Sequence, residues 1–219
     1  MESIISIILS IFIPVLANAY IPKSCIVFFS GGSNYMSRTI YSDFLSNIDP
    51  TKYDVIQFNK NIELDLEYSK YNEITYLAHS SGATTAINNI SPDVNHLFLL
   101  DPVATPNLEL NTISLDNIEY IDIINADLSY RWSRYPPFIP FIPVFKLDPS
   151  RLEIMTRNIK TITMKGYGHA DLIDNPYRDI MHYTGLSRGS RDRSLSAINR
   201  YHNNLARYIQ WRIDNKYVK

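Results

Sequence analysis

Cysteine, net charge and repeated sequence are all scarce in this 219-residue chain, which has no heptad array or low-complexity tract. The only cysteine, Cys25, lies in an apolar run, which excludes an intramolecular disulfide framework, a CxxC redox pair and a cysteine-based zinc site. The formal net charge of −1 offers no positive surface to nucleic acid or to an anionic membrane. We therefore expect neither as a partner, and we expect no metal or other cofactor.

An uncharged apolar run at the N-terminus, residues 4–16, is too short to span a bilayer. Ala17-Asn18-Ala19 follows it and fits the small-x-small pattern of a signal-peptide cleavage site, although Glu2 stands where a basic residue is usual. We predict a signal peptide over residues 1–19 and a secreted protein. The alternatives are an uncleaved anchor and a hydrophobic helix packed on the domain. Membrane contact is expected only through this segment or through a lipid substrate.

Residues 20–219 are long enough to form one sizeable core and too short for two ordinary enzyme domains, so we predict a single domain. Short, nearly continuous apolar runs indicate strands that are covered on both faces of a parallel sheet. Helical periodicity occurs between or after them, over residues 35–48, 82–89 and 194–213. This alternation predicts an α/β fold with a mostly parallel open sheet of about six strands and flanking helices. The predicted strands are residues 25–29, 53–58, 74–78, 96–100, 118–124 and 159–164.

A serine flanked by small residues follows the third predicted strand and precedes a helical segment. Ala78 lies two residues before Ser80, and Gly82 lies two residues after it. This spacing is typical of a nucleophile elbow, a strained turn at which bulky flanking side chains would collide with neighbouring backbone. In such an elbow the backbone N–H of Ser81 contributes to the oxyanion hole, beside a helix N-terminus. The alternative is an ordinary N-cap serine followed by glycine.

A serine nucleophile needs a base, and His169 is the best candidate. It follows the last predicted strand and precedes the final helix, a position from which a sheet with a nucleophile elbow supplies its histidine. Glycines at positions 166 and 168 allow the loop to turn the imidazole back over the sheet. The other histidines have structural interpretations: His79 as a variable elbow position, His96 as the start of a strand, and His182 and His202 as surface residues.

Two aspartates compete as the acid that orients the histidine. Asp101 ends the fourth predicted strand, and Asp127 follows the fifth. Both are expected at the edge where active sites of open α/β sheets gather. Spacing alone does not separate them.

The loop after the first predicted strand, Phe29-Ser30-Gly31-Gly32-Ser33-Asn34, is a candidate second half of the oxyanion hole. Glycine permits close backbone approach to a substrate oxygen, so we expect an N–H donor from Gly32 or Ser33. A phosphate-binding loop is the rival interpretation, but the Lys-Ser/Thr pair of a P-loop is missing. A glycine turn without a ligand is the structural alternative.

Two segments interrupt the alternation of strands and helices. Residues 130–148 combine six aromatic residues with four prolines, a composition that excludes a helix or a central strand. The segment either lines an apolar cleft or forms a lid, or it is an irregular layer over the sheet. Residues 186–193 carry three arginines around a glycine, and either meet an anionic substrate group or form a solvated loop.

Read together, these motifs resemble the chlorophyllase family, which is related within the α/β-hydrolase superfamily to the platelet-activating-factor acetylhydrolases and dienelactone hydrolases. The resemblance covers residues 26–174, with Ser30 where a histidine is usual and Ala78 where a glycine is usual. It implies that the catalytic acid is the aspartate of the Asp-Pro-Val segment, Asp101. The matching segments are Phe28-Phe29-Ser30-Gly31-Gly32, Tyr41-Ser42-Asp43-Phe44-Leu45, His79-Ser80-Ser81-Gly82, Leu100-Asp101-Pro102-Val103 and Tyr167-Gly168-His169-Ala170-Asp171-Leu172-Ile173-Asp174.

The sequence therefore predicts a serine hydrolase of the α/β-hydrolase fold. Ser80, His169 and Asp101 would form its triad and cleave a carboxylic ester, a small and lipophilic molecule, through an acyl-enzyme. The alternative is a non-catalytic hydrolase-like module that uses the same fold as a binding surface.

Overall fold

The structure, a computed structural model, describes residues 23–34, 38–58, 68–109, 115, 117–129, 145–153, 158–183 and 194–215. The predicted signal peptide, residues 130–144 of the aromatic segment and residues 186–193 lie outside the described residues.

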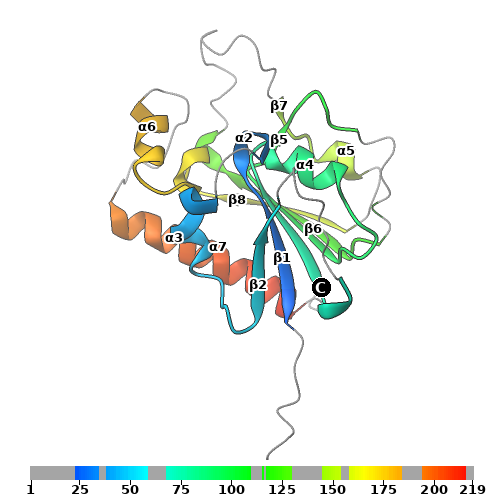
Figure 1. Cartoon of the computed structure of the whole chain (residues 1–219). Helices are drawn as coiled ribbons and strands as arrows, with labels where there is room; N and C mark the ends of the chain where they lie inside the picture. The colour runs from blue at the N-terminus through cyan, green and yellow to red at the C-terminus, as the bar shows by residue number, and fades with distance from the viewer. Residues whose placement is uncertain are drawn as a thin grey trace, which may run out of the picture.

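A single six-stranded parallel sheet forms the centre of the molecule (Figure 1). The strand order is β2-β1-β3-β4-β6-β8, and all five neighbouring pairs are parallel. Every residue of β3, β4 and β6 is buried, which explains why their sequences are mostly apolar without alternation. The predicted sheet is confirmed, with the fifth predicted strand displaced two residues toward the C-terminus. The strands are β1 (Ser24–Phe29), β2 (Tyr53–Gln57), β3 (Ile74–His79), β4 (His96–Leu100), β6 (Tyr120–Ala126) and β8 (Ile159–Met164).

The strand order reverses direction at β1. The chain runs from β1 outward to β2, and then crosses β1 to build β3, β4, β6 and β8 on its other side. The carboxyl ends of β1 and β3 therefore lie side by side where the order reverses, with Phe29 opposite Ala78. Ligands of open α/β sheets bind outside such a switch point, so the topology directs attention to this edge.

Helices lie over the two faces of the sheet (Figure 1), and each face has its own hydrophobic core. Alternate residues of β1 point to opposite faces: Val27 joins the core under α4 (Gly82–Asn88) and α5 (Ser150–Glu153), and Phe28 joins the core under α3 (Ser42–Leu45) and α7 (Leu195–Asp214). A small second sheet pairs β5 (Val103–Ala104) with β7 (Phe145–Lys146) in antiparallel fashion. In the described part of the chain, no helix is both long and apolar enough to cross a bilayer.

The helix predicted over residues 35–48 is wrong in its continuity. Residues 35–37 are not described, and a 3₁₀ turn, η1 (Arg38–Tyr41), precedes the four-residue α3. The break lies at Tyr41, whose ψ of 14° is outside the α-helical range and whose hydroxyl bonds elsewhere in the molecule. Hydrophobic periodicity cannot detect this break, because the apolar positions of the predicted helix, Ile40, Phe44 and Leu45, are also buried in the broken one.

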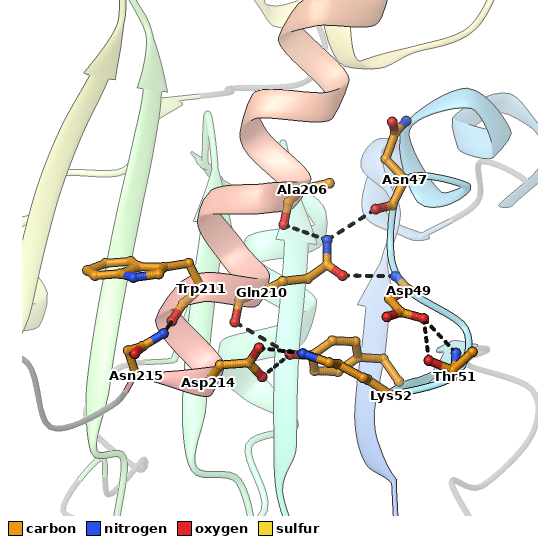
Figure 2. Close-up of polar contacts among 10 residues, drawn as sticks. Asn47, Asp49, Thr51, Lys52, Ala206, Gln210, Trp211, Asp214 and Asn215 are labelled. Carbon is orange, nitrogen blue, oxygen red and sulfur yellow. Dashed lines mark hydrogen bonds and ion pairs between the residues drawn. The ribbon is translucent and has the colours of Figure 1, made fainter.

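The last helix, α7, is fastened to the rest of the domain by polar contacts near its C-terminal end (Figure 2). The Gln210 side chain accepts from the Asp49 N–H at 2.9 Å and donates to the Asn47 carbonyl at 3.1 Å, while Lys52 pairs with Asp214 at 2.9 Å. On the sheet side, Arg212 donates to both carboxylate oxygens of Asp122 on β6, at 2.9 and 3.2 Å. Asp122 is fully buried, so its ion pair with Arg212 is shielded from water, unlike the exposed pair of Lys52 and Asp214.

Gly82, the first residue of α4, lies against the end of β1. A Cβ atom there would come within 2.5 Å of the carbonyl oxygens of Phe29 and Ser30, which are backbone atoms and cannot rotate away. Glycine therefore allows the start of α4 to contact the end of β1. This contact is the steric reason for the small residue that the elbow pattern predicts two positions after Ser80.

Replacing Arg212 with alanine would leave the buried Asp122 without its cation. We expect Arg212→Ala to lower the free energy of unfolding by about 3 kcal/mol, measured by urea denaturation. The matched control is Lys52→Ala, which removes an exposed pair and should leave the unfolding midpoint almost unchanged. Equal losses from the two variants would contradict the distinction.

Replacing Gly82 with alanine tests the contact between α4 and β1 by the sign of the effect. Helix propensity alone favours alanine over glycine by about 1 kcal/mol. The backbone clash predicts the opposite, a loss of about 3 kcal/mol in urea denaturation. A Gly82→Ala protein as stable as the wild type, or more stable, would show that the contact is not as close as described.

Candidate active site

Ser80 occupies a left-handed turn between β3 and α4. Its φ is 57°, a conformation that non-glycine residues seldom adopt outside functional sites. Backbone hydrogen bonds hold the strained turn: the Ser80 N–H donates to the Leu100 carbonyl at 3.1 Å, and its own carbonyl accepts from Ala83 at 3.1 Å and from Val103 at 3.0 Å. The half-buried Ser80 is thereby fixed at the carboxyl edge of the sheet.

The structure brings Ser80, His169 and Asp101 into one hydrogen-bonded series. The Nε2 atom of His169 lies 2.8 Å from Ser80 Oγ, and its Nδ1 atom lies 2.6 Å from Asp101 Oδ2. A carboxylate only accepts hydrogen bonds, so Nδ1 carries a hydrogen, and in the tautomer with Nδ1–H alone Nε2 can accept from the serine hydroxyl. A hydroxyl, an imidazole and a carboxylate thus lie within hydrogen-bonding distance of one another in series.

Asp101 is held as firmly as the serine. It lies directly after β4 with a φ of 42°, and its backbone N–H donates to the Ile124 carbonyl at 2.7 Å. Its Oδ1 atom accepts from the Ala126 N–H at 3.1 Å, which leaves Oδ2 for the imidazole. Burial raises the pKa of Asp101, but hydrogen bonding and the charge of His169 outweigh it, so the net pKa lies below its usual range. Asp101 is therefore ionised at neutral pH.

Asp127, the competing carboxylate, has a different partner. Its Oδ1 atom accepts from the Gly166 N–H at 2.7 Å, at an exposed position in the turn after β8. Asp127 and Asp101 both follow strands, as predicted, but the structure pairs His169 with Asp101.

The loop that carries His169 rests on a buried aspartate, Asp171. His169 begins a 3₁₀ turn, η5 (His169–Leu172), and Asp171 Oδ2 accepts from the Gly168 N–H at 2.8 Å. His182 lies 3.1 Å from the second carboxylate oxygen, and His202 lies 2.8 Å from the Asp171 carbonyl. The expectation that His182 and His202 are surface residues is wrong, because both are buried here. Their polar partners are distant in sequence, so helical periodicity gave no sign of them.

The glycine loop lies beside the elbow. Gly31–Asn34 form a short helix, α2, that packs against α4, and Gly32 has a φ of 63° that favours glycine. The first N–H groups of a helix have no partner within it. Gly31 donates its N–H to the Tyr41 hydroxyl at 3.0 Å, so it is already engaged. The N–H groups of Gly32 and Ser33 are the remaining candidates of this loop.

Sequence reasoning missed two residues at this site, Tyr41 and His79. The Tyr41 hydroxyl lies 3.0 Å from His79 Nδ1, and His79 Nε2 lies 3.1 Å from the His169 carbonyl oxygen. The position of His79 next to the nucleophile was the available signal. Its partners are 38 and 90 residues away, however, and local spacing cannot indicate them.

The described residues contain no group of three or more His, Cys, Asp or Glu side chains arranged to hold a metal ion. The chemistry available at this edge of the sheet is that of a hydroxyl, an imidazole, a carboxylate and backbone N–H groups.

Comparison with known proteins identifies the fold. No family model matches the sequence, and no curated protein matches it. Among solved structures, a candidate alpha/beta hydrolase of unknown function from Agrobacterium tumefaciens has a TM-score of 0.51 at 13% identity, over 90% of this chain and 88% of that one. Est1E from Butyrivibrio proteoclasticus has a TM-score of 0.47 at 11% identity, over 88% of each chain. The first of these similarities, together with the strand order, shows that the chain has the predicted α/β-hydrolase fold.

Proposed function

We propose that this protein is a serine hydrolase that cleaves carboxylic esters through a covalent acyl-enzyme. The observation that carries the proposal is the hydrogen-bonded series from Ser80 Oγ through His169 to Asp101, at 2.8 and 2.6 Å. Each member comes from a different part of the chain, and the pKa of Asp101 is lowered, so its carboxylate is ionised as acyl transfer needs. A buried structural serine requires neither a left-handed turn nor an imidazole with an ionised partner.

In the proposed reaction, Ser80 Oγ attacks the ester carbonyl carbon while its proton moves to His169 Nε2. Collapse of the tetrahedral intermediate breaks the bond to the alcohol oxygen, which takes the proton from His169. Water then attacks the acyl-enzyme and gives its proton to the same nitrogen, and the acid leaves as Ser80 regains its hydrogen. Asp101 stays ionised throughout, since it orients the imidazole and stabilises the imidazolium.

Backbone N–H groups would stabilise the oxyanion. The proposed donors are Ser81, at the start of α4, and Gly32 or Ser33 in the α2 loop. The engagement of the Gly31 N–H by Tyr41 supports this choice, because it leaves the next two residues of the loop as donors. Two donors from separate segments would fix the position of the carbonyl oxygen relative to Ser80 Oγ.

The substrate class, the location of the protein and its domain extent are proposals from sequence. The aromatic and proline-rich segment 130–145 supports a small lipophilic ester as substrate. The apolar segment 1–19 supports secretion of a single hydrolase domain, residues 20–219. The rival function, a non-catalytic binding module, would leave the ionised, hydrogen-bonded Asp101 and the strained Ser80 without a purpose.

The enzyme and the binding module are distinguished by one assay. Purified protein is exposed to a fluorophosphonate probe and to short p-nitrophenyl esters, beside Ser80→Ala. We expect the wild type to be labelled and to turn over ester, and Ser80→Ala to do neither, because only an activated serine reacts with the probe. Ser81→Ala is the matched control and should still be labelled, because its proposed contribution is a backbone N–H. Absence of labelling in the wild type would sink the enzyme proposal.

The acid is tested by paired amide substitutions. We expect Asp101→Asn to lower kcat for a p-nitrophenyl ester by about 10,000-fold, because the amide no longer favours the productive tautomer of His169. Asp127→Asn, which changes only the exposed contact with Gly166, should leave kcat close to that of the wild type. The reverse order of effects would overturn the assignment of Asp101.

A further inference from the structure

A chain of three hydrogen bonds joins the proposed oxyanion loop to the backbone of the proposed base. The Gly31 N–H donates to the Tyr41 hydroxyl at 3.0 Å, and that hydroxyl lies 3.0 Å from His79 Nδ1. His79 Nε2 in turn lies 3.1 Å from the carbonyl oxygen of His169. The chain thus begins one residue before a proposed oxyanion donor, Gly32, and ends on the residue that accepts the proton.

The carbonyl oxygen of His169, at the end of this series, determines the donor and the acceptor in all three hydrogen bonds. A carbonyl oxygen only accepts, so His79 Nε2 carries a hydrogen and donates it to His169. Burial, followed by the proximity of His169, lowers the pKa of His79 to about 3, so the imidazole is neutral and its Nδ1 is an acceptor. The Tyr41 hydroxyl must therefore donate to Nδ1. Its oxygen then accepts the Gly31 N–H, so all three bonds are compatible with one another.

Burial makes it difficult for water to replace these three hydrogen bonds. Tyr41 is fully buried and His79 is 1% exposed, so water cannot readily substitute for either partner. The rings also pack together: the His79 and His169 centroids are 4.7 Å apart, and those of Tyr41 and His79 are 5.5 Å apart in an edge arrangement. Tyr41 lies at the break between η1 and α3, where the sequence predicts a continuous helix. The helix is therefore interrupted at the residue that makes these contacts.

We propose that Tyr41 and His79 are positioning residues that hold the His169 backbone and the Gly31–Gly32 loop at a fixed separation on either side of Ser80. This role rests on the proposed hydrolase function. Neither side chain reaches the reacting atoms, since His79 bonds the His169 backbone and leaves both imidazole nitrogens to Ser80 and Asp101. The pair acts on the geometry of the transition state, in which the base and the oxyanion donors must be correctly placed at the same time.

The test compares kcat and KM for p-nitrophenyl acetate in variants of the full-length protein. Tyr41→Phe removes the hydroxyl and keeps the ring, and His79→Leu removes both hydrogen-bonding nitrogens. His79→Gln restores a donor and an acceptor on a side chain of similar reach. Tyr120→Phe is the matched control, because it removes the hydroxyl of another buried tyrosine. Tyr120 is the first residue of β6, and its hydroxyl donates to the Arg212 carbonyl at 2.7 Å.

We expect Tyr41→Phe and His79→Leu each to lower kcat by about 10- to 100-fold with KM little changed, because misplaced catalytic groups affect the transition state more than substrate binding. His79→Gln should recover most of the lost kcat, and Tyr120→Phe should retain it. Because the two residues act in one chain, the double variant Tyr41→Phe/His79→Leu should fall no further than the worse single variant. Thermal unfolding of each variant identifies any that does not fold. If His79→Leu does not fold, the kcat of His79→Gln is compared with that of the wild type instead.

The outcomes separate this proposal from the function on which it rests. If the wild type hydrolyses the ester and Tyr41→Phe does so with unchanged kcat, the positioning role is wrong and the hydrolase stands. Equal losses of kcat in Tyr41→Phe and Tyr120→Phe, or multiplied losses in the double variant, would also overturn it by indicating general destabilisation. A wild type that hydrolyses no ester refutes the proposed function itself.

Discussion

The left-handed turn at Ser80 is the constraint on which the rest of the site depends. A parallel strand must become a helix within two residues there, between His79 and Gly82, and the turn is possible only because neighbouring backbone takes up its polar groups. The carbonyl of Leu100 at the end of β4 and the N–H of Val103 beyond it both bond to Ser80. The same contacts therefore fix the end of β4, where Asp101 begins. Strain at the serine and placement of the acid have a common origin.

The neutral imidazole of His79 complements the arrangement of Ser80, His169 and Asp101. The rings of His79 and His169 are 4.7 Å apart, so a positive charge on His79 would oppose proton transfer to His169. Burial keeps His79 uncharged, and the carbonyl bond makes it a donor at one nitrogen only. The ionised Asp101 lies on the other side of the same imidazole, at Nδ1. In the proposed reaction, His169 thus takes its proton beside an ionised carboxylate and a neutral imidazole.

The sheet and the elbow at Ser80 could be predicted from sequence because their signals are local. Buried parallel strands are mostly apolar, and the steric demands of the elbow appear as Ala78 and Gly82 around Ser80. The choice between Asp101 and Asp127 could not be made from spacing, since both follow strands at the same edge. Tyr41 and His79 were missed because their hydrogen bonds link segments 38 and 90 residues apart. Tyr41 also interrupts a helix whose apolar periodicity is unbroken.

The central claim is that Ser80 becomes acylated during turnover, and the direct measurement is the site of the acyl group. The protein is mixed with p-nitrophenyl acetate, quenched with acid in the pre-steady state, digested and analysed by peptide mass spectrometry. An acetyl group on Ser80, lost on longer incubation and trapped when deacylation is slowed, is the expected result. Ester turnover with an unmodified Ser80, or with the acetyl group on another residue, would contradict the claim.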